Sequence, residues 1–242
     1  MKLAFISDIH GNAIALESVL ADIRRQNVDE IIVLGDLCYR GPEPKRSLQL
    51  IRSLETKVIK GNADEWVVRG VKEGEVPDKA LTMMNAERDW TVSHLDQDDI
   101  NYLASLPTEL ELPLTSNRSL HAFHATPNSL FDVVLPDTPP DQLQEKLINN
   151  SSHDLYIYAH IHLPYVRYFN GKCYANLGSV GLPFDGLPQA SYAIVEVVDE
   201  RFKVTIERVP YDVDKVIRQY SDYNFPNADA LIDVVKNAKS PF

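Results

Sequence analysis

An α/β fold with two β-sheets flanked by helices is predicted for this chain of 242 residues. Apolar strands alternate with amphipathic helices through residues 2–60, which is the βαβαβ pattern of a parallel sheet. A series of strand-like runs follows residue 108 and requires a second sheet. Hydrophobic residues make up 44% of the chain, which is enough for one large core. We therefore expect a single domain over residues 1–242.

The first part of the chain supplies the strand–helix repeats. Apolar runs predict strands, and apolar residues at helical spacing predict helices, in the order Lys2–Ser7, Ala13–Arg25, Glu30–Leu34, Pro44–Leu54 and Lys57–Lys60. Because strands and helices alternate, we expect the first sheet to be largely parallel. Residues 63–106 look helical and irregular, with Asp78 and Asp96 as predicted N-caps. We expect this helical insert to shape a pocket.

The second part of the chain is dominated by strands. The predicted strands are Glu109–Leu114, Ser119–Ala125, Leu155–Ala159, Val166–Phe169, Lys172–Leu177, Ser191–Val198 and Phe202–Val209. Asn170-Gly171 predicts a two-residue hairpin turn. Helices are predicted over Pro139–Leu147 and, at the C-terminal end (about 212–238), over Asp212–Tyr220 and Asn227–Ala238.

Charge and composition exclude several classes of function. The formal charge is 24 − 35 = −11, which argues against extended binding to nucleic-acid backbones. The N-terminal apolar run is too short for a signal peptide, and no later run approaches a membrane span, so we expect a cytoplasmic protein with no membrane partner. Cys38 and Cys173 form no CxxC pair and are interpreted as structural.

Polar side chains follow each of the first three predicted strands. Asp8 and His10 end the first strand two residues apart, so both side chains project to the same face. Asp36 follows the second strand and Asn62 the third. Because the carboxyl ends of parallel strands share one edge of a sheet, where α/β proteins bind ligands, these groups are candidate metal ligands. A helix cap is the alternative for Asn62.

Histidines follow two of the later strands. His160 and His162 repeat the two-residue spacing after the strand Leu155–Ala159, and His124 follows the strand around Leu120. Histidines clustered after apolar strands favour metal ligation over packing. The other candidates have no partner pattern and are interpreted as structural: His94, His121 and His153.

The ordered set Asp8-Ile9-His10, Gly35-Asp36, Gly61-Asn62, His124 and His160-Ile161-His162 resembles the five-block signature of the calcineurin-like metallophosphoesterases. The run Asn176-Leu177-Gly178-Ser179-Val180-Gly181 is similar to a further loop of the small bacterial and archaeal phosphodiesterase branch. The resemblance implies a four-layer α/β/β/α sandwich. It covers most of the chain and leaves out the helical insert and the C-terminal residues.

The resemblance also implies a pair of metal ions. Asp8, His10, Asp36 and His162 would hold one ion, and Asp36, Asn62, His124 and His160 the other, with Asp36 as the bridge. The ligand types suit transition metals, of which the resemblance favours manganese, while iron, zinc, nickel and cobalt stay open. Hydroxide shared by the ions would attack a small phosphodiester or phosphomonoester, and a nucleotide is one candidate.

Three departures from the family pattern bear on the activity. Ala63 stands where many members carry a histidine that protonates the leaving group. Ala159 and Ile161 replace a glycine and a hydroxyl residue, and Phe184 occupies the place of an arginine found in close relatives. A phosphoprotein phosphatase and a non-catalytic scaffold, a role that a protein of this fold has in the retromer complex, remain alternatives.

Further residues have two interpretations each. Arg40 is a candidate catalytic residue beside Asp36, Asn62 and His10, because guanidinium binds phosphate bidentately, but it also fits a surface ion pair. Asn12 is better explained as the cap of the first helix. Four aromatic side chains could stack on a nucleobase, although buried packing explains each one singly: Tyr39, Trp66, Trp90 and Phe184.

Overall fold

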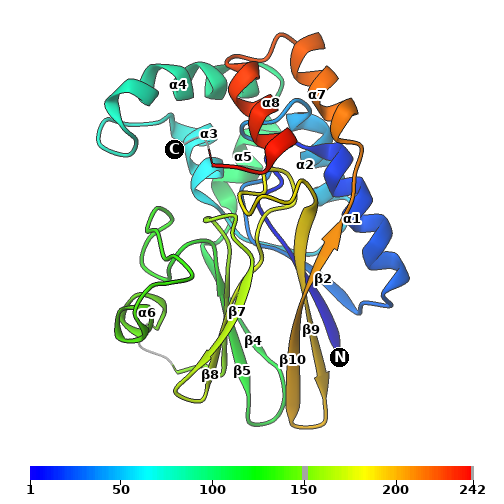
Figure 1. Cartoon of the computed structure of the whole chain (residues 1–242), viewed down its shortest axis with the longest axis vertical. Coiled ribbons are helices and arrows are strands. Elements are labelled where there is room, and N and C mark those ends of the chain that lie inside the picture. Colours follow the sequence, from blue (N-terminus) through cyan, green and yellow to red (C-terminus); the bar gives the residue numbers. More distant parts are fainter. Residues whose placement is uncertain (149–151, 241–242) are drawn as a thin grey trace.

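Two five-stranded sheets form the centre of the computed structural model, which describes residues 1–148 and 152–240 (Figure 1). The first sheet has the order β10 (Arg201–Val209), β9 (Ala190–Val198), β1 (Lys2–Ile6), β2 (Glu30–Val33) and β3 (Lys57–Val58). The second sheet has the order β4 (Glu109–Pro113), β5 (Ser119–Phe123), β6 (Leu155–Tyr158), β8 (Lys172–Asn176) and β7 (Tyr165–Phe169).

The two sheets bury their facing sides in a common apolar core. Alternate residues of the central strands point into it, among them Phe5 of β1, Ile32 of β2 and Ile157 of β6. Four-layer packing results, because helices cover the other face of each sheet. The predicted α/β sandwich of two sheets flanked by helices is confirmed.

Helices cover the outer faces and one end of the sandwich. The helices α1 (Ala13–Arg25) and α2 (Pro44–Arg52) pack on the first sheet, and α6 (Pro140–Leu147) packs on the second. At the upper end in Figure 1 lie the remaining five: α3 (Asn62–Arg69), α4 (Asp78–Ser93), α5 (Gln97–Ser105), α7 (Val213–Asp222) and α8 (Ala228–Asn237). The predicted insert thus consists of the three helices α3–α5.

Two expectations about the elements are wrong. The first sheet is mixed: β1, β2 and β3 are parallel as predicted, but β9 pairs antiparallel with β1 and with β10. Asp78 is the first residue of α4, whose cap position is Pro77, whereas Asp96 does cap α5 by accepting the N–H of Asp99. Pro77 takes the cap position with an extended backbone (φ −56°, ψ 136°), so α4 begins one residue earlier than a cap at Asp78 would give.

The strand directions bring the functional loops together. The strands β1, β2 and β3 run parallel in one sheet, and β5 and β6 run parallel in the other. Their carboxyl ends lie under the insert, so the loops after all five strands meet at one end of the sandwich. The side chains singled out in the sequence lie on these loops.

Candidate metal centre

Seven predicted ligands converge at this end of the sandwich and define the candidate dinuclear centre: Asp8, His10, Asp36, Asn62, His124, His160 and His162. In one half, the Nε2 atoms of His10 and His162 lie 3.1 Å apart, and His162 Nε2 lies 3.2 Å from Asp8 Oδ1. In the other half, Asn62 Oδ1 lies 2.9 Å from His124 Nε2 and 2.8 Å from His160 Nδ1.

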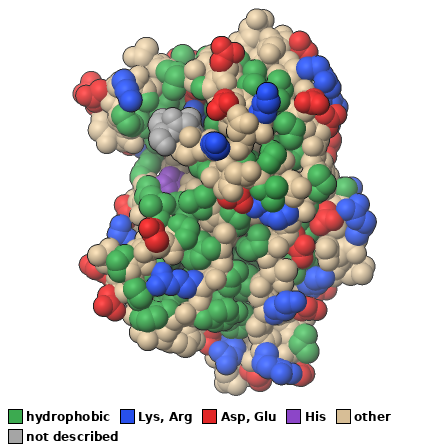
Figure 2. Space-filling view, in the orientation of Figure 1, with side chains coloured by type: hydrophobic (Ala, Val, Ile, Leu, Met, Phe, Trp, Pro, Cys, Tyr) green, Lys and Arg blue, Asp and Glu red, His purple; other side chains and the backbone are tan. Residues whose placement is uncertain are grey.

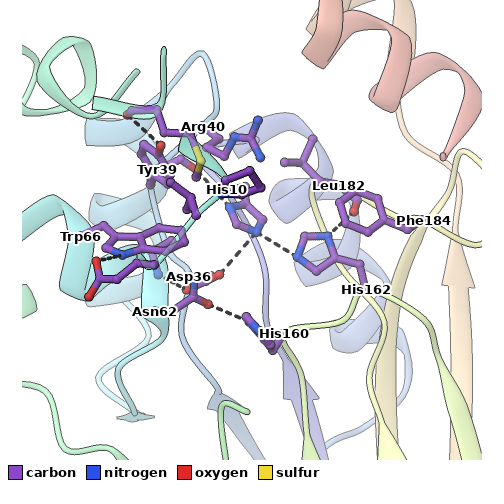
Figure 3. Close-up of a pocket in the computed structure, with 15 residues that line it drawn as sticks. His10, Asp36, Tyr39, Arg40, Asn62, Trp66, His160, His162, Leu182 and Phe184 are labelled. Atoms are coloured by element: carbon purple, nitrogen blue, oxygen red, sulfur yellow. Dashed lines mark hydrogen bonds and ion pairs between the residues drawn. The ribbon is translucent and has the colours of Figure 1, made fainter. Parts of the chain in front are cut away.

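Asp36 lies between the two halves. Its Oδ2 atom is 3.6 Å from His10 Nε2 (Figure 3). The same atom is 3.5 Å from His124 Nε2. Its Oδ1 atom accepts the N–H of Ala63 at 2.8 Å, which fixes the orientation of the carboxylate. Asp36 therefore lies within 3.6 Å of one imidazole from each half.

Backbone carbonyls orient three of the imidazoles. The Nδ1–H groups of His10 and His124 donate to the carbonyls of Tyr39 and Leu34, at 3.0 and 2.7 Å. Nδ1 of His162 donates in the same way to the carbonyl of Leu182. In each neutral ring the Nε2 lone pair then points into the centre, which is the arrangement found in metal-ligating histidines.

The donor set fits cations better than it fits hydrogen bonds. The lone pairs of His10 and His162 face each other, and Asp8 Oδ1 is buried with no hydrogen-bond donor among the described residues. Buried acceptors that face one another are costly unless a cation lies between them. The arrangement of carboxylate, imidazole and amide oxygen suits divalent transition metals.

Charges within the centre shift the titration of its members. Burial lowers the pKa of His10 to about 4, and burial together with His124 lowers that of His160 to about 4. Burial also opposes a charge on His124, but Asp36 and Asp8 outweigh it and raise the pKa of His124 to about 9. Although burial acts to raise it, His124 and His10 hold the pKa of Asp36 well below its usual range. At neutral pH, therefore, His10 and His160 are neutral, while His124 of the metal-free protein carries a proton.

Metal binding is consequently expected to release about one proton per chain at pH 7. A metal ion binds only the neutral imidazole, and His124 is the ring that must give up its proton. Calorimetric titration of the metal-free protein with Mn²⁺ in two buffers of different ionisation enthalpy measures this number. The apparent affinity should also rise with pH until about pH 9, where His124 loses its proton unaided. Equal observed enthalpies in the two buffers would show that no proton leaves.

Unusual backbone geometry accompanies the ligands. Positive φ angles between 48° and 69° occur at five of them: Asp8, His10, Asp36, His160 and His162. Residues other than glycine rarely adopt this conformation, which costs free energy and persists where the surrounding structure enforces it. The loops after β2 and β3 help to enforce it by packing closely against each other. A Cβ on Gly61 would lie only 2.1 Å from Asp36 Oδ1, so residue 61 must be glycine for this approach.

The loop over residues 176–181 holds the centre from the side of the second sheet. Ser179 Oγ and the N–H of Gly181 both donate to the carbonyl of Asp8, at 2.8 and 2.9 Å. Asn176 Nδ2 donates to the carbonyl of Ala159, directly before the paired histidines. The loop that resembles the phosphodiesterase branch thus joins the Asp8 loop to the His160 loop.

Asp64 is a supporting residue that the sequence analysis did not identify. Its buried carboxylate accepts the N–H groups of Asp36, Leu37 and Gly61 at 2.8, 2.9 and 2.8 Å. Burial and the neighbouring Asp36 raise its pKa to about 7. Its place two residues after Asn62 was the available signal, but the contact depends on how closely the loops approach.

A cavity of about 390 Å³ opens onto the centre. In Figure 2 a histidine is visible in the hollow between the helical end and the sheets. The rest of the lining is largely apolar and includes Trp66, Val76, Met84 and Phe184. The cavity therefore combines a polar, metal-competent wall with an apolar one.

Arg40 and three of the four aromatic side chains line this cavity: Tyr39, Trp66 and Phe184 (Figure 3). Arg40 is only 8% exposed and pairs with the fully buried Glu87 at 2.9 Å, so the predicted surface ion pair is instead a buried one. The ring of Phe184 stacks on His162 with centroids 4.3 Å apart. Trp90 packs on Phe225 and does not line the cavity.

The remaining predicted residues lie outside the centre. Asn12 caps α1 by accepting the N–H of Ala15, as expected. His94 is exposed and bonds to the carbonyl of Trp90. His121 of β5 and His153, which precedes β6, lie side by side with ring centroids 5.1 Å apart. The described residues contain no helix long and apolar enough to cross a membrane.

Comparison with known proteins identifies the family. Residues 1–200 match the calcineurin-like phosphoesterase superfamily domain. An uncharacterised protein of Methanocaldococcus jannaschii is 30% identical over 243 residues, covering 93% of each chain. Phosphodiesterase YfcE of Escherichia coli is 26% identical over 204 residues, covering 81% of this chain and 88% of its own.

A solved structure agrees with the match. The crystal structure of a metallophosphoesterase from Sphaerobacter thermophilus superposes with a TM-score of 0.78 at 26% identity and covers 98% of this chain and 100% of its own. The match therefore extends over both sheets, the insert and the C-terminal helices. This chain belongs to the calcineurin-like phosphoesterase superfamily, in the branch of small YfcE-like phosphodiesterases.

Proposed function

We propose that this protein is a dinuclear metal-dependent hydrolase of small phosphodiesters or phosphomonoesters, with a nucleotide as one candidate substrate. The observation that carries the proposal is the convergence of seven donor side chains, six of them buried, with lone pairs turned to one volume at the polar wall of a cavity. Helix capping or packing of single residues does not account for so many acceptors in one place.

Two divalent ions fit the two halves of the centre. Asp8, His10 and His162 would hold one ion, Asn62, His124 and His160 the other, and Asp36 both. Bound there, the ions would supply Lewis acidity towards phosphate oxygens and a nucleophilic water at neutral pH. Manganese is the favoured metal, and iron, zinc, nickel and cobalt also suit these ligands.

Residues of the chain bind and orient the ester. Together the ions carry more positive charge than Asp8 and Asp36 neutralise, so the wall attracts phosphate. Arg40 lines the cavity beside the centre and is proposed as a further phosphate contact. His10 and Asn62, also at the wall, would position the phosphoryl group. Because Ala63 offers no proton at the family's acid position, esters with good leaving groups should react fastest.

The shape of the cavity favours a small substrate over a phosphoprotein. Its volume of about 390 Å³ lies within the range of small-molecule sites, about 300–1,000 Å³. An organic group can lie on the apolar wall while its phosphate faces the metals. The scaffold alternative is less well supported, because every ligand of the family signature is present in this chain.

Hydrolysis of bis-p-nitrophenyl phosphate and p-nitrophenyl phosphate tests the proposal. Metal-stripped protein should be inactive and should regain turnover with added Mn²⁺, and the ratio of the two rates separates diesterase from monoesterase. Absence of turnover with either ester, by folded protein that has bound two metal ions, would contradict the proposal and favour the scaffold.

Phe184→Ala is expected to raise KM for the nitrophenyl ester by about two- to tenfold with little change in kcat, because the lost aromatic contact is worth about 0.5–1.5 kcal/mol and acts equally on ground and transition states. Steady-state kinetics measure the two constants. Phe184→Leu is the matched control, since it keeps an apolar group of similar size and should retain most of the affinity. An unchanged KM in Phe184→Ala would place the ester elsewhere in the cavity.

A further inference from the structure

A second cluster of histidines and carboxylates lies on the outer face of the second sheet. Glu111 of β4 is directly opposite His121 of β5, and His153 precedes β6. One ligand atom from each of these three residues lies within 4.8 Å of the others. The cluster is distinct from the candidate dinuclear centre, because His121 faces away from the core between the sheets and His153 stands at the amino end of β6, opposite to His160.

Each imidazole of this cluster has one nitrogen engaged and one without a hydrogen-bond partner. His121 Nε2 bonds to Glu109 Oε2 at 2.9 Å, and His153 Nδ1 bonds to Ser119 Oγ at 2.9 Å. The other nitrogens, Nδ1 of His121 and Nε2 of His153, are buried and find no hydrogen-bond partner in the described part of the chain. Buried nitrogens without partners are costly, and binding of an ion by their lone pairs would remove this cost.

The charges around the two imidazoles favour a cation. The two rings are 2% and 6% exposed, whereas the side chains of Glu109 and Glu111 are 45% and 55% exposed and reach the cluster from its solvent side. Within residues 1–148 and 152–240 no lysine or arginine forms an ion pair with either carboxylate. The bond from His121 to Glu109 is the one that metal-ligating histidines commonly make with their other nitrogen.

The spacing of the donors also fits a metal ion. His153 Nε2 lies 3.2 Å from Glu111 Oε1, at an angle that makes no hydrogen bond. Two ligands about 2.0 Å from a tetrahedral zinc ion are separated by about 3.3 Å. Glu111 is exposed enough to move the remaining distance towards His121, and solvent can fill the fourth position.

We propose that Glu111, His121 and His153 form a mononuclear site for a divalent transition-metal ion of the zinc type, with Glu109 orienting His121. The ion would join β4, β5 and the segment before β6, which are far apart in the sequence. Its role is therefore structural, and it is independent of catalysis at the dinuclear centre.

Calorimetric titration of the metal-stripped full chain with Zn²⁺ tests this site. Glu111→Gln is expected to bind one equivalent fewer than wild type, whatever number the rest of the chain binds, and to lose part of the rise in melting temperature that zinc gives wild type. Because Glu111 is exposed, this substitution should not disturb folding. His153→Gln should lose the same equivalent, with its fold checked by circular dichroism.

Glu196→Gln is the matched control, since Glu196 is an exposed glutamate on β9, away from the cluster. It should bind as many zinc ions as wild type. The proposal is overturned if Glu111→Gln and wild type bind the same number of ions, or if the difference appears only at millimolar zinc. Failure of phosphoesterase activity would leave this result unaffected, because the titration counts ions and does not measure turnover.

Discussion

Asp36→Asn is expected to lower kcat/KM for the nitrophenyl esters by more than roughly 10- to 100-fold. That range is the usual loss when a residue that hydrogen-bonds to a metal ligand is mutated. Asparagine has nearly the shape of aspartate, but its NH₂ group cannot ligate a metal and its charge is zero. Since Asp36 lies 3.6 and 3.5 Å from His10 and His124, its loss weakens both halves of the centre. Steady-state assays with Mn²⁺ and metal analysis of the purified variant measure the effect.

Two further variants calibrate this result. Asp64→Asn changes a carboxyl group that contacts only the backbone N–H groups of Asp36, Leu37 and Gly61, so the loss of activity should stay within about 10- to 100-fold. Asp222→Asn changes an exposed aspartate of α7 and should leave activity unchanged. If Asp36→Asn retained more than about a tenth of wild-type activity, Asp36 would not be a bridging ligand.

Glu87→Ala is expected to destabilise the protein by about 3–5 kcal/mol, the usual cost of removing one partner of a buried ion pair. Glu87 is fully buried in α4, bonds to Arg40 Nε at 2.9 Å and accepts Nδ2 of Asn227 at 3.3 Å. The substitution leaves the guanidinium of Arg40 without this carboxylate in a buried position. Urea unfolding followed by circular dichroism measures the difference.

The double variant Arg40→Met with Glu87→Leu separates charge from packing. It replaces both ions with apolar groups, so most of the lost stability should return. Its activity should stay below that of the wild type, because Arg40 is proposed to contact the phosphate. A loss below about 1 kcal/mol in Glu87→Ala would mean that the pair is as weak as an exposed one.

The convergence of the candidate ligands could be predicted because it depends on local sequence and strand direction. Asp8, Asp36 and Asn62 each follow an apolar run, and parallel strands bring such ends to one edge. The paired histidines after β6 follow the same rule in the second sheet. The sandwich itself was predictable from the order of strand and helix patterns.

Other features depend on contacts between distant segments. β9 extends the first sheet by antiparallel pairing with β1, and β10 pairs with β9 in the same way, which no local pattern indicates. Asp64 accepts bonds from the Asp36 loop only because Gly35 and Gly61 let the two loops approach. Glu87 looks like any charged residue of a helix, and only tertiary packing buries it against Arg40.

Anomalous diffraction from a crystal of the manganese-loaded protein tests the central claim most directly. Two manganese peaks are expected on either side of the Asp36 carboxylate, about 3.5–4 Å apart as in two-metal hydrolases. One should lie among Asp8, His10 and His162, and the other among Asn62, His124 and His160. A single peak, or none at these residues in a well-ordered crystal grown with excess Mn²⁺, would contradict a dinuclear centre.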